Sequence, residues 1–264
     1  MPKSQFVYQE IITTLTSKRP VLKYIETLHR KLKVEGSFLD FLAQLTLYRE
    51  LNARTNTAID KIKDGVDLKS LIEVSFFGEE RWEKITHLDR PIVFFATHFG
   101  CDRLAQLLSL RVPKVVSISL NVDGKFNNTE FIGLTNPEKR VLSSALFLKS
   151  IKAGAHGVFY IDVGHSVSEV EVRFLEWTRV MPAGITKIIR MQPISLIPTI
   201  AILDRQFSSR VTVHFGNPIF LHDQTAQMND QQIVQTLVDA LEDFSLEVRE
   251  QFPESNYQFH PYRL

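Results

Sequence analysis

Five consecutive apolar residues at positions 92–96 are the stretch around which the predicted fold is organised. A run without polar breaks is typical of a central parallel strand, which is covered on both faces. A tight turn is predicted next, because Gly100 lets the chain bend sharply. Helical spacing follows at Leu104, Ala105, Leu107 and Leu108. His98 is therefore predicted at the carboxyl end of a buried strand, where open α/β sheets build their sites.

Further apolar or alternating runs predict strands at 71–77, 114–120, 157–162, 170–175, 194–203 and 211–215. Helical spacing predicts helices at 137–151, 185–189 and 230–252. The alternation of residues 170–175 places that strand nearer the edge of the sheet. Strands that alternate with helices predict an α/β fold, with a mostly parallel sheet flanked by helices.

Two helices and one polar segment carry more specific expectations. The helix that begins at Pro137 is expected to bury Val141, Ala145, Leu148 and Ile151. The last helix is expected to bury Ile233, Leu237, Leu241, Phe244 and Val248. Residues 121–136 are polar and hold the pair Asn127-Asn128, which predicts a long loop. Loops of this length in compact domains are usually functional or mobile.

Residues 1–66 show helical spacing with little strand character, so we expect an N-terminal helical layer ahead of an α/β domain at 67–264. Residues 20–33 form an amphipathic helix with a basic face, which is either a solvated surface or a contact for an anionic bilayer or acidic partner. A second helix follows Gly36-Ser37, with its buried side expected at Phe38, Phe41, Leu42, Leu45 and Tyr48.

Composition narrows the class of protein. The 264 residues carry 31 Lys and Arg against 30 Asp and Glu, so no net charge favours a nucleic-acid partner. One cysteine rules out an internal disulfide framework and fits a reducing compartment. No stretch approaches the roughly 20 apolar residues that span a bilayer. We expect a cytoplasmic protein, with contact at the inner face of the membrane through amphipathic surface alone.

Motifs between residues 70 and 220 follow a recognisable order. Residues 74–80 and 91–100 hold a strand ended by glycine and then the histidine turn. Residues 152–162 hold the end of a helix, Gly154 and a strand that leads to Asp162. Residues 181–184, 194–203 and 211–219 close the section. In this order they resemble the lysophospholipid acyltransferase superfamily, and most closely its lipid A late-acyltransferase (lauroyl/myristoyl transferase) branch.

The resemblance implies transfer of an acyl group from a thioester to a hydroxyl or amine. The donor would be acyl-CoA or acyl carrier protein, acting as co-substrate, with no further cofactor. The motif of the family is a histidine with an Asp or Glu five positions later, which makes His98 the implied general base. A hydroxyl is a poor nucleophile until a base takes its proton, and a neutral imidazole does this near pH 7. A carboxylate orients the imidazole and stabilises the imidazolium.

The sequence departs from this motif, because Arg103 stands five positions after His98. Three interpretations remain open. Asp102 supplies the acid, if the turn is irregular there. Asp162 reaches His98 from a neighbouring strand, with His165 close by. Alternatively no acid replaces it, and the chain is a non-catalytic acyl- or lipid-binding relative. A thioester hydrolase is a further alternative, which differs in what reaches His98.

Several other side chains are candidates for binding. Cys101 adjoins the histidine, but neighbouring residues rarely point the right way to pair, and a small buried core residue is the simpler interpretation. Cationic and glycine positions near the predicted turns are candidate contacts for a substrate phosphate, namely Gly100, Arg103, Arg173, Arg179, Lys187 and Arg190. Solvated surface charge is the alternative for each of these cations. We expect the segment 121–136 to shape the choice of acceptor.

The phenylalanines have two interpretations, an acyl pocket or an ordinary core, and the sequence does not separate them. They are Phe94, Phe95, Phe99, Phe131, Phe147, Phe159 and Phe174. His214 and His222 flank a turn without ligand partners at useful spacing, and no cysteine-histidine cluster is present in the sequence. We therefore expect no metal site.

Overall fold

The computed structural model describes residues 37–61, 67–98, 103–119, 122–134, 137–162, 168–174, 177–204 and 210–252. Its main sheet has eight strands in the order β1-β10-β9-β2-β6-β3-β5-β4. These are β1 (Glu73–Phe77), β2 (Ile92–Ala96), β3 (Val115–Ser119), β4 (Gly124–Phe126), β5 (Thr129–Gly133), β6 (His156–Tyr160), β9 (Ser195–Leu203) and β10 (Arg210–Phe215). A separate hairpin joins β7 (Glu169–Phe174) to β8 (Trp177–Pro182).

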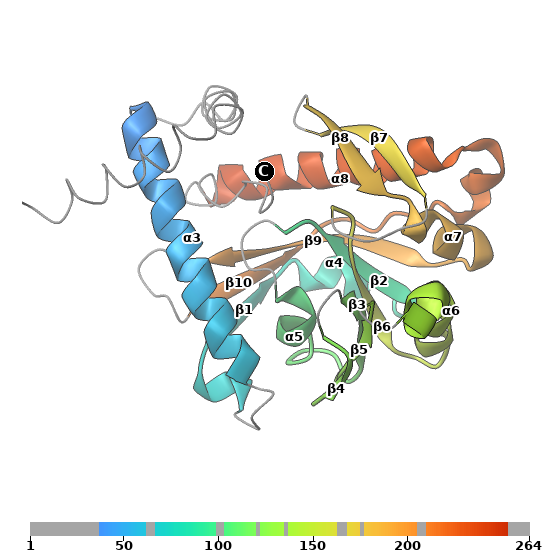
Figure 1. Cartoon of the computed structure of the whole chain (residues 1–264), viewed down its shortest axis with the longest axis horizontal. Helices are drawn as coiled ribbons and strands as arrows, with labels where there is room; N and C mark the ends of the chain where they lie inside the picture. The colour runs from blue at the N-terminus through green and yellow to red at the C-terminus, as the bar shows by residue number, and fades with distance from the viewer. Residues whose placement is uncertain are drawn as a thin grey trace, which may run out of the picture.

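The helices are α3 (Phe38–Asp60), α4 (Glu79–Glu83), α5 (Leu104–Leu108), α6 (Pro137–Lys152), α7 (Gly184–Met191) and α8 (Asp230–Gln251). Short 3-10 turns, η2 (Leu68–Ser70) and η3 (His222–Gln227), complete the described elements. In the main sheet β9–β10 and β4–β5 are antiparallel, and the other pairs are parallel. The predicted fold class is confirmed: a mostly parallel sheet flanked by helices (Figure 1).

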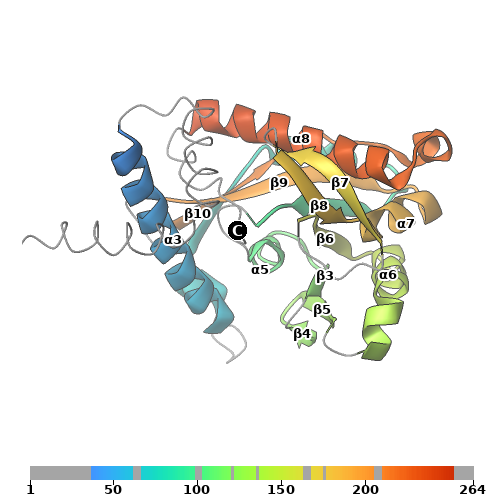
Figure 2. The same cartoon turned by 45° about the horizontal axis from the view of Figure 1, so that its top comes forward.

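All five residues of β2 are buried because both faces of the sheet are covered. Val93 and Phe95 belong to a core cluster with side chains of α6, α7 and α8. Ile92, Phe94 and Ala96 belong to a second cluster with side chains of α4 and α5. Alternate residues of a strand point to opposite faces, so a strand between two helical layers must be apolar throughout. Figure 2 shows α8 crossing one side of the sheet, next to the β7–β8 hairpin.

Helix α3 lies across one end of the sheet and closes it (Figure 1). It begins with a capping box, in which Ser37 and Asp40 each satisfy an amide of the other. Its buried residues were largely as predicted, since Phe41, Leu42, Leu45 and Tyr48 are buried. The first three join the cluster of α6–α8, and Tyr48 with Ile59 joins the cluster of α4 and α5. The expected boundary near residue 66 stays a prediction, and residues 20–33 lie outside the described part.

The structure corrects the prediction of a loop at residues 121–136. Most of the segment is the β4–β5 hairpin, and β5 adds to the sheet in parallel with β3. A two-residue turn at Asn127-Asn128 joins the strands, with Asn127 at a φ of 52°. Asparagine tolerates the left-handed region that such turns require. The paired asparagines were the signal for a hairpin.

Two further expectations were wrong in part. In α6, Leu148 and Ile151 are buried as expected, but Val141 is 84% exposed and Ala145 is also exposed. The buried side of the helix is centred on Phe147 and Ile151, and the helical repeat turns positions 141 and 145 away from it. The strand predicted at 170–175 does alternate, yet it is not an edge of the main sheet. It pairs as β7 with β8, a strand that the sequence analysis did not predict, and its buried side packs with α8. All five positions expected to be buried in the last helix are buried.

Within the described residues, no helix combines the length and apolarity needed to cross a lipid bilayer.

His214, on β10, is a buried histidine, with only 2% of its surface exposed. Its ring centroid lies 5.6 Å from that of Phe77 and 4.5 Å from that of Phe252, and its Nε2 atom has no hydrogen-bond partner. Burial lowers the pKa of His214 to about 4, and the Arg81 charge acts in the same direction while Glu247 opposes it. The folded protein therefore holds this imidazole in its neutral form.

Acid should destabilise the protein partly through His214. The unfolded imidazole has a pKa of about 6.5, so the stability that the neutral ring contributes is present above that pH and is lost as the pH falls towards about 4. We expect His214→Leu to reduce the loss in unfolding free energy between pH 7 and pH 4.5 by on the order of 2–3 kcal/mol, measured by chemical denaturation.

The exposed His87 provides the control, since His87→Leu should lose as much stability in acid as the parent protein. Burial also lowers the pKa of His156, and that contribution remains in all three proteins. An acid loss in His214→Leu equal to that of the parent would contradict the assignment.

Candidate functional site

His98 and Asp162 meet because their strands are neighbours in register. Strands β2 and β6 pair in parallel with Ala96 opposite Tyr160, so the residues two positions beyond each strand end come together. The Nδ1 atom of His98 lies 2.8 Å from Oδ1 of Asp162. The backbone N–H of His98 donates to the other oxygen, Oδ2, at 2.9 Å. One carboxylate therefore holds both the main chain and the ring of the histidine.

The pair lies where the chain leaves two adjacent strands towards opposite faces. After β2 the chain enters α5, whose Leu104 and Leu107 pack in the cluster with α4. After β6 it passes through the β7–β8 hairpin to α7, whose Ile185 and Ile188 pack in the opposite cluster. In open α/β sheets, a switch point of this kind at the carboxyl ends of the strands is the usual ligand position.

Tyr160 fixes the other side of the imidazole. Its ring stacks on His98 with the centroids 4.3 Å apart and the planes inclined by 26°. Its hydroxyl accepts a hydrogen bond from the backbone N–H of Leu104 at 3.0 Å, at the start of α5. The side chains of His98 and Asp162 are 19% and 18% exposed. The ring is thus held in place while remaining partly open to solvent.

The hydrogen bonds determine which ring nitrogen is basic. An ionised carboxylate only accepts hydrogen bonds, so Nδ1 of His98 carries the proton that Asp162 receives. The Nε2 atom of the neutral ring then has its lone pair available. This arrangement suits a general base, with the carboxylate as the orienting group.

Arg103 does not stand in for the missing motif acid. Its Nε and Nη2 atoms donate to the two carboxylate oxygens of Asp60 at 3.1 and 3.0 Å. The fork ties the residue before α5 to the last residue of α3. Asp60 was not foreseen, because it precedes Arg103 by 43 residues and no motif connects the two.

Of the two acids considered for His98, Asp102 and Asp162, the structure places Asp162 beside it. Asp102, Gly100, Cys101 and His165 lie outside the described residues, so their predicted roles remain predictions. The geometry permits a catalytic role for Asp162, and that role also stays a prediction.

The remaining cationic candidates lie on other elements. The Arg190 guanidinium donates to the carbonyls of Thr225 and Met228 and contacts Asp230, which anchors α7 to η3 and α8. Residue Asp223 of η3 pairs with Arg90, two residues before β2. Arg190 therefore lies at the opposite end of β2 from His98.

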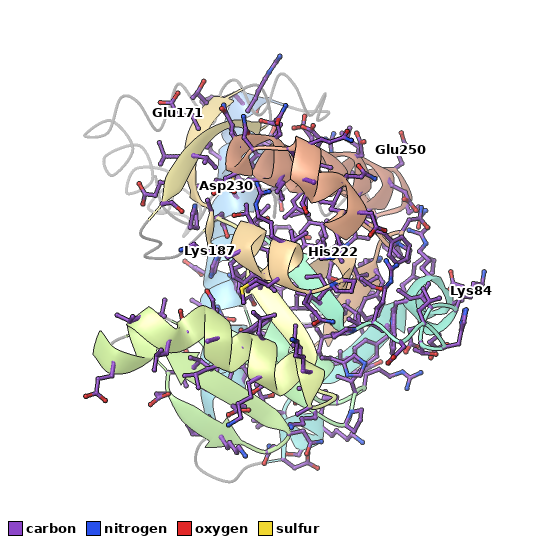
Figure 3. The ribbon with its side chains drawn as sticks, turned by 90° about the vertical axis from the view of Figure 1, so that its right-hand side faces the viewer. Lys84, Glu171, Lys187, His222, Asp230 and Glu250 are labelled. Atoms are coloured by element: carbon purple, nitrogen blue, oxygen red, sulfur yellow. The ribbon has the colours of Figure 1, made fainter. Side chains whose placement is uncertain are left out.

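Lys187 lies on the same helix as Arg190 and is exposed (Figure 3). Arg173 and Arg179 belong to the β7–β8 hairpin, where both the N–H and the carbonyl of Arg173 bond the Gln235 amide on α8. The prediction that Arg173, Arg179 and Lys187 bind substrate is not supported by a contact with the imidazole, and it stays a prediction.

Most of the candidate phenylalanines are core residues. Phe94, Phe95, Phe147, Phe159 and Phe174 are buried within the two clusters. Phe131 is the exception, because it also lines a pocket beside α5. Phe99 lies outside the described residues. Among the residues that the structure describes, no three His, Cys, Asp or Glu side chains are grouped so as to hold a metal ion.

Comparison with known proteins gives no family for the chain. No family model matches it, and no curated protein matches it in sequence. A solved structure of similar fold is the 1-acyl-sn-glycerophosphate (LPA) acyltransferase PlsC from Thermotoga maritima, which is 11% identical, covers 94% of this chain and 98% of its own, and has a TM-score of 0.43. A likeness at this level carries no functional conclusion, so the chemistry must rest on the side chains themselves.

The tautomer of His98 can be measured directly. Neutral histidine in water favours the proton on Nε2, whereas the bond to Asp162 requires it on Nδ1. We expect ¹⁵N NMR of the protein above pH 8 to show the Nδ1–H form for His98. His222 is the positive control, because its Nδ1 faces the Ile189 carbonyl at 2.7 Å, which also only accepts. An Nε2–H form at His98 would contradict the site.

Proposed function

We propose that this chain is an acyltransferase, which moves a fatty or related acyl group from a thioester donor to a hydroxyl or amine acceptor. The single observation that carries the proposal is the His98–Asp162 pair at the switch point between β2 and β6. The resemblance of the motif order to the lysophospholipid acyltransferase superfamily supplies the reaction class. The lipid A branch of that superfamily is one source of acceptors among several.

The reaction follows from the basic nitrogen. Nε2 of His98 takes the proton of the acceptor hydroxyl or amine as its oxygen or nitrogen attacks the thioester carbonyl. Asp162 stabilises the imidazolium that forms, through the bond at Nδ1. When the tetrahedral intermediate collapses, the carbon–sulfur bond breaks and the imidazolium gives its proton to the leaving sulfur. The products are the acylated acceptor and a free thiol.

Asp162 answers the difficulty that Arg103 creates for this proposal. In the family the acid follows the histidine by five positions. Here an acid that follows the neighbouring strand, Asp162, bonds Nδ1 of the histidine instead. The His98–Asp162 distance of 2.8 Å is that of a working charge-assisted hydrogen bond. The stacked Tyr160 ring adds a second constraint on the imidazole.

The remaining parts of the proposal concern the surroundings of the reaction. The donor is acyl-CoA or acyl carrier protein, used as a co-substrate, and the chemistry requires no metal or further cofactor. The protein would work in the cytoplasm and meet lipid acceptors at the inner face of the membrane as a peripheral protein. Nucleic acid is not a partner in this scheme.

Acyl transfer should depend on both members of the pair. We expect His98→Ala and Asp162→Asn each to lower kcat by about 10³–10⁴-fold. Asp162→Asn acts because one of its two positions becomes an NH₂ donor. It cannot accept from both the His98 N–H and the ring, so the ring turns to the tautomer with the proton on Nε2. The measurement is thiol release together with acylated product, using acyl-CoA and acyl carrier protein as donors.

The matched control is Asp204→Asn, at the end of β9 and outside this pair, which should retain activity. Free fatty acid as the only product, with the same dependence on His98, would identify a thioester hydrolase. Donor binding without turnover, in the parent protein as in His98→Ala, would identify a non-catalytic relative. Hydrolysis alone or binding alone would each overturn the proposal.

A further inference from the structure

Tyr160, the last residue of β6, contacts two parts of the chain that border the proposed site. Its ring stacks on the imidazole of His98, with the centroids 4.3 Å apart and the planes inclined by 26°. Its hydroxyl accepts a hydrogen bond from the backbone N–H of Leu104 at 3.0 Å. One half-buried side chain therefore joins the imidazole to the first residue of α5.

The hydrogen bond to Asp162 does not by itself fix the plane of the imidazole. It holds Nδ1 of His98 at 2.8 Å from the carboxylate. A ring held at its Cβ atom and at one nitrogen can still tilt about the line that joins these two points. The basic Nε2 atom lies off that line, so tilting moves it relative to an acceptor. The Tyr160 ring lies against one face of the imidazole and opposes tilt in that direction.

The hydroxyl of Tyr160 keeps its ring in this position. The residue before α5, Arg103, provides no side-chain cap for the helix. The tyrosine hydroxyl therefore satisfies one of the amides that a helix leaves free at its start. Leu104 is itself only 1% exposed, within the core cluster that includes α4 and α5. The tyrosine is thus held at both ends, by its backbone in β6 and by its hydroxyl on a buried residue.

The stacked ring also favours the charged form of the imidazole during the reaction. In the proposed mechanism His98 takes a proton from the acceptor, so its ring becomes a cation. The face of a tyrosine ring attracts a cation that lies within about 6 Å of the ring centroid. The 4.3 Å separation from Tyr160 is inside that range. An interaction that strengthens as the transition state forms acts on kcat more than on KM.

We propose that Tyr160 is a positioning residue for acyl transfer, which acts through His98. Its ring holds the plane of the imidazole and stabilises the imidazolium, and its hydroxyl fastens that ring to α5. The effect on turnover rests on the proposed function, whereas the effect on the histidine ring does not depend on turnover. A tyrosine that only packed against the end of the strand would change stability alone.

Two variants separate the ring of Tyr160 from its hydroxyl. Tyr160→Leu removes both, and Tyr160→Phe removes only the hydroxyl. In acyl-transfer assays on the full chain we expect Tyr160→Leu to lower kcat by about 10–100-fold and to change each KM by less than about threefold. Tyr160→Phe should lower kcat by about threefold to fivefold, because the ring remains but is no longer anchored.

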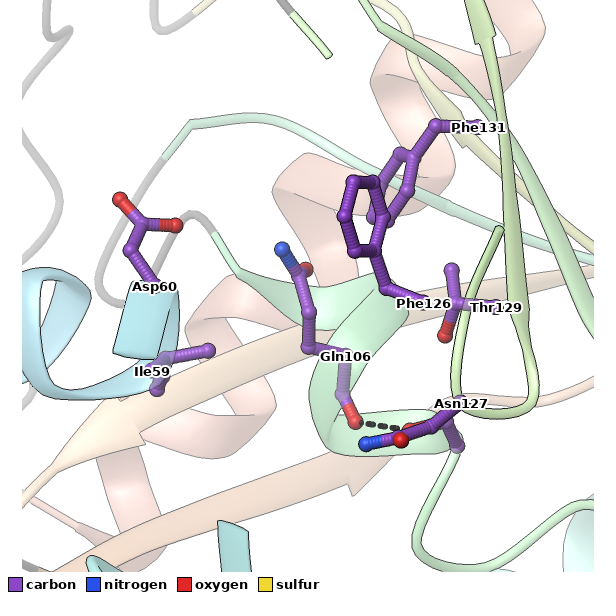
Figure 4. Close-up of a pocket in the computed structure, with 8 residues that line it drawn as sticks. Ile59, Asp60, Gln106, Phe126, Asn127, Thr129 and Phe131 are labelled. Carbon is purple, nitrogen blue, oxygen red and sulfur yellow. Dashed lines mark hydrogen bonds between the residues drawn. The ribbon is translucent and has the colours of Figure 1, made fainter. Parts of the chain in front are cut away.

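Phe126→Leu is the matched control, because it also removes a half-buried ring from contact with another ring. The centroids of Phe126 and Phe131 lie 6.0 Å apart, in the β4–β5 hairpin (Figure 4). Phe126 pairs with Thr129, which lies opposite Val115 in β3. Val115 lies opposite His156, the first residue of β6. The control is therefore level with the opposite end of β6, and it should leave kcat unchanged.

The tautomer of His98 gives a measurement into which turnover does not enter. The ¹⁵N shifts of the two ring nitrogens report the fraction of each tautomer. We expect the Nε2–H fraction to rise to at least about one third in Tyr160→Leu, because a ring that is free to tilt exchanges its bond with Asp162 for one with water. The fraction should stay at the parental value in Phe126→Leu.

A parental kcat in Tyr160→Leu, a loss confined to KM, or an equal loss in Phe126→Leu would each overturn the positioning role. If Tyr160→Leu does not fold, Tyr160→Phe decides, and a parental kcat there overturns the role. A tautomer that depends on Tyr160 in a chain without acyl transfer overturns the proposed function, while the hold on the imidazole stands. Transfer by the parent that neither Tyr160 variant alters overturns this inference alone.

Discussion

The parallel pairing of β2 with β6 is the constraint on which the site depends. Because Ala96 lies opposite Tyr160, the two residues that follow each strand emerge side by side. A shift of one residue in this register would turn every side chain of one strand to the other face. The apolar side chains of β2 are committed to two different cores, Phe95 with α8 and Phe94 with α5. The packing that stabilises the sheet thereby also sets the distance between the histidine and its acid.

Helices α3 and α5 are held in place next to the His98–Asp162 pair. Helix α5 begins at Leu104, and its first residues are held from two sides. The Leu104 N–H bonds the Tyr160 hydroxyl, and Arg103 bonds Asp60 of α3. Helix α3 is therefore tied to the start of α5 as well as covering the core. Its buried side chains, which enter both clusters, hold it in this position.

Local periodicity predicted most of the elements, while spatial adjacency was beyond it. The run at 92–96 and the spacing in α8 reveal their elements because burial on one or two faces imposes a repeat. The β4–β5 hairpin was missed because a polar segment with two asparagines was weighed by composition instead of by turn chemistry. Asp162 was among the candidate acids, but choosing it required knowing that β6 lies beside β2, which hydrophobic spacing does not encode. Asp60 carried no signal, since its contact with Arg103 joins two distant segments of the chain.

Both carboxylate oxygens of Asp162 bond the same residue: one accepts from the backbone N–H of His98 and the other from its ring. An acid that arrives from the adjacent strand removes the need for one within the turn itself. Position 103 then need not hold an acid. Here it holds Arg103, whose guanidinium binds Asp60 at the end of α3. Searches for histidine–carboxylate pairs by linear spacing will overlook this arrangement, whereas searches by neighbouring strands and their register will find it. The same arrangement is possible in any parallel sheet where two neighbouring strands end at the same level, because the residues that follow them then lie side by side.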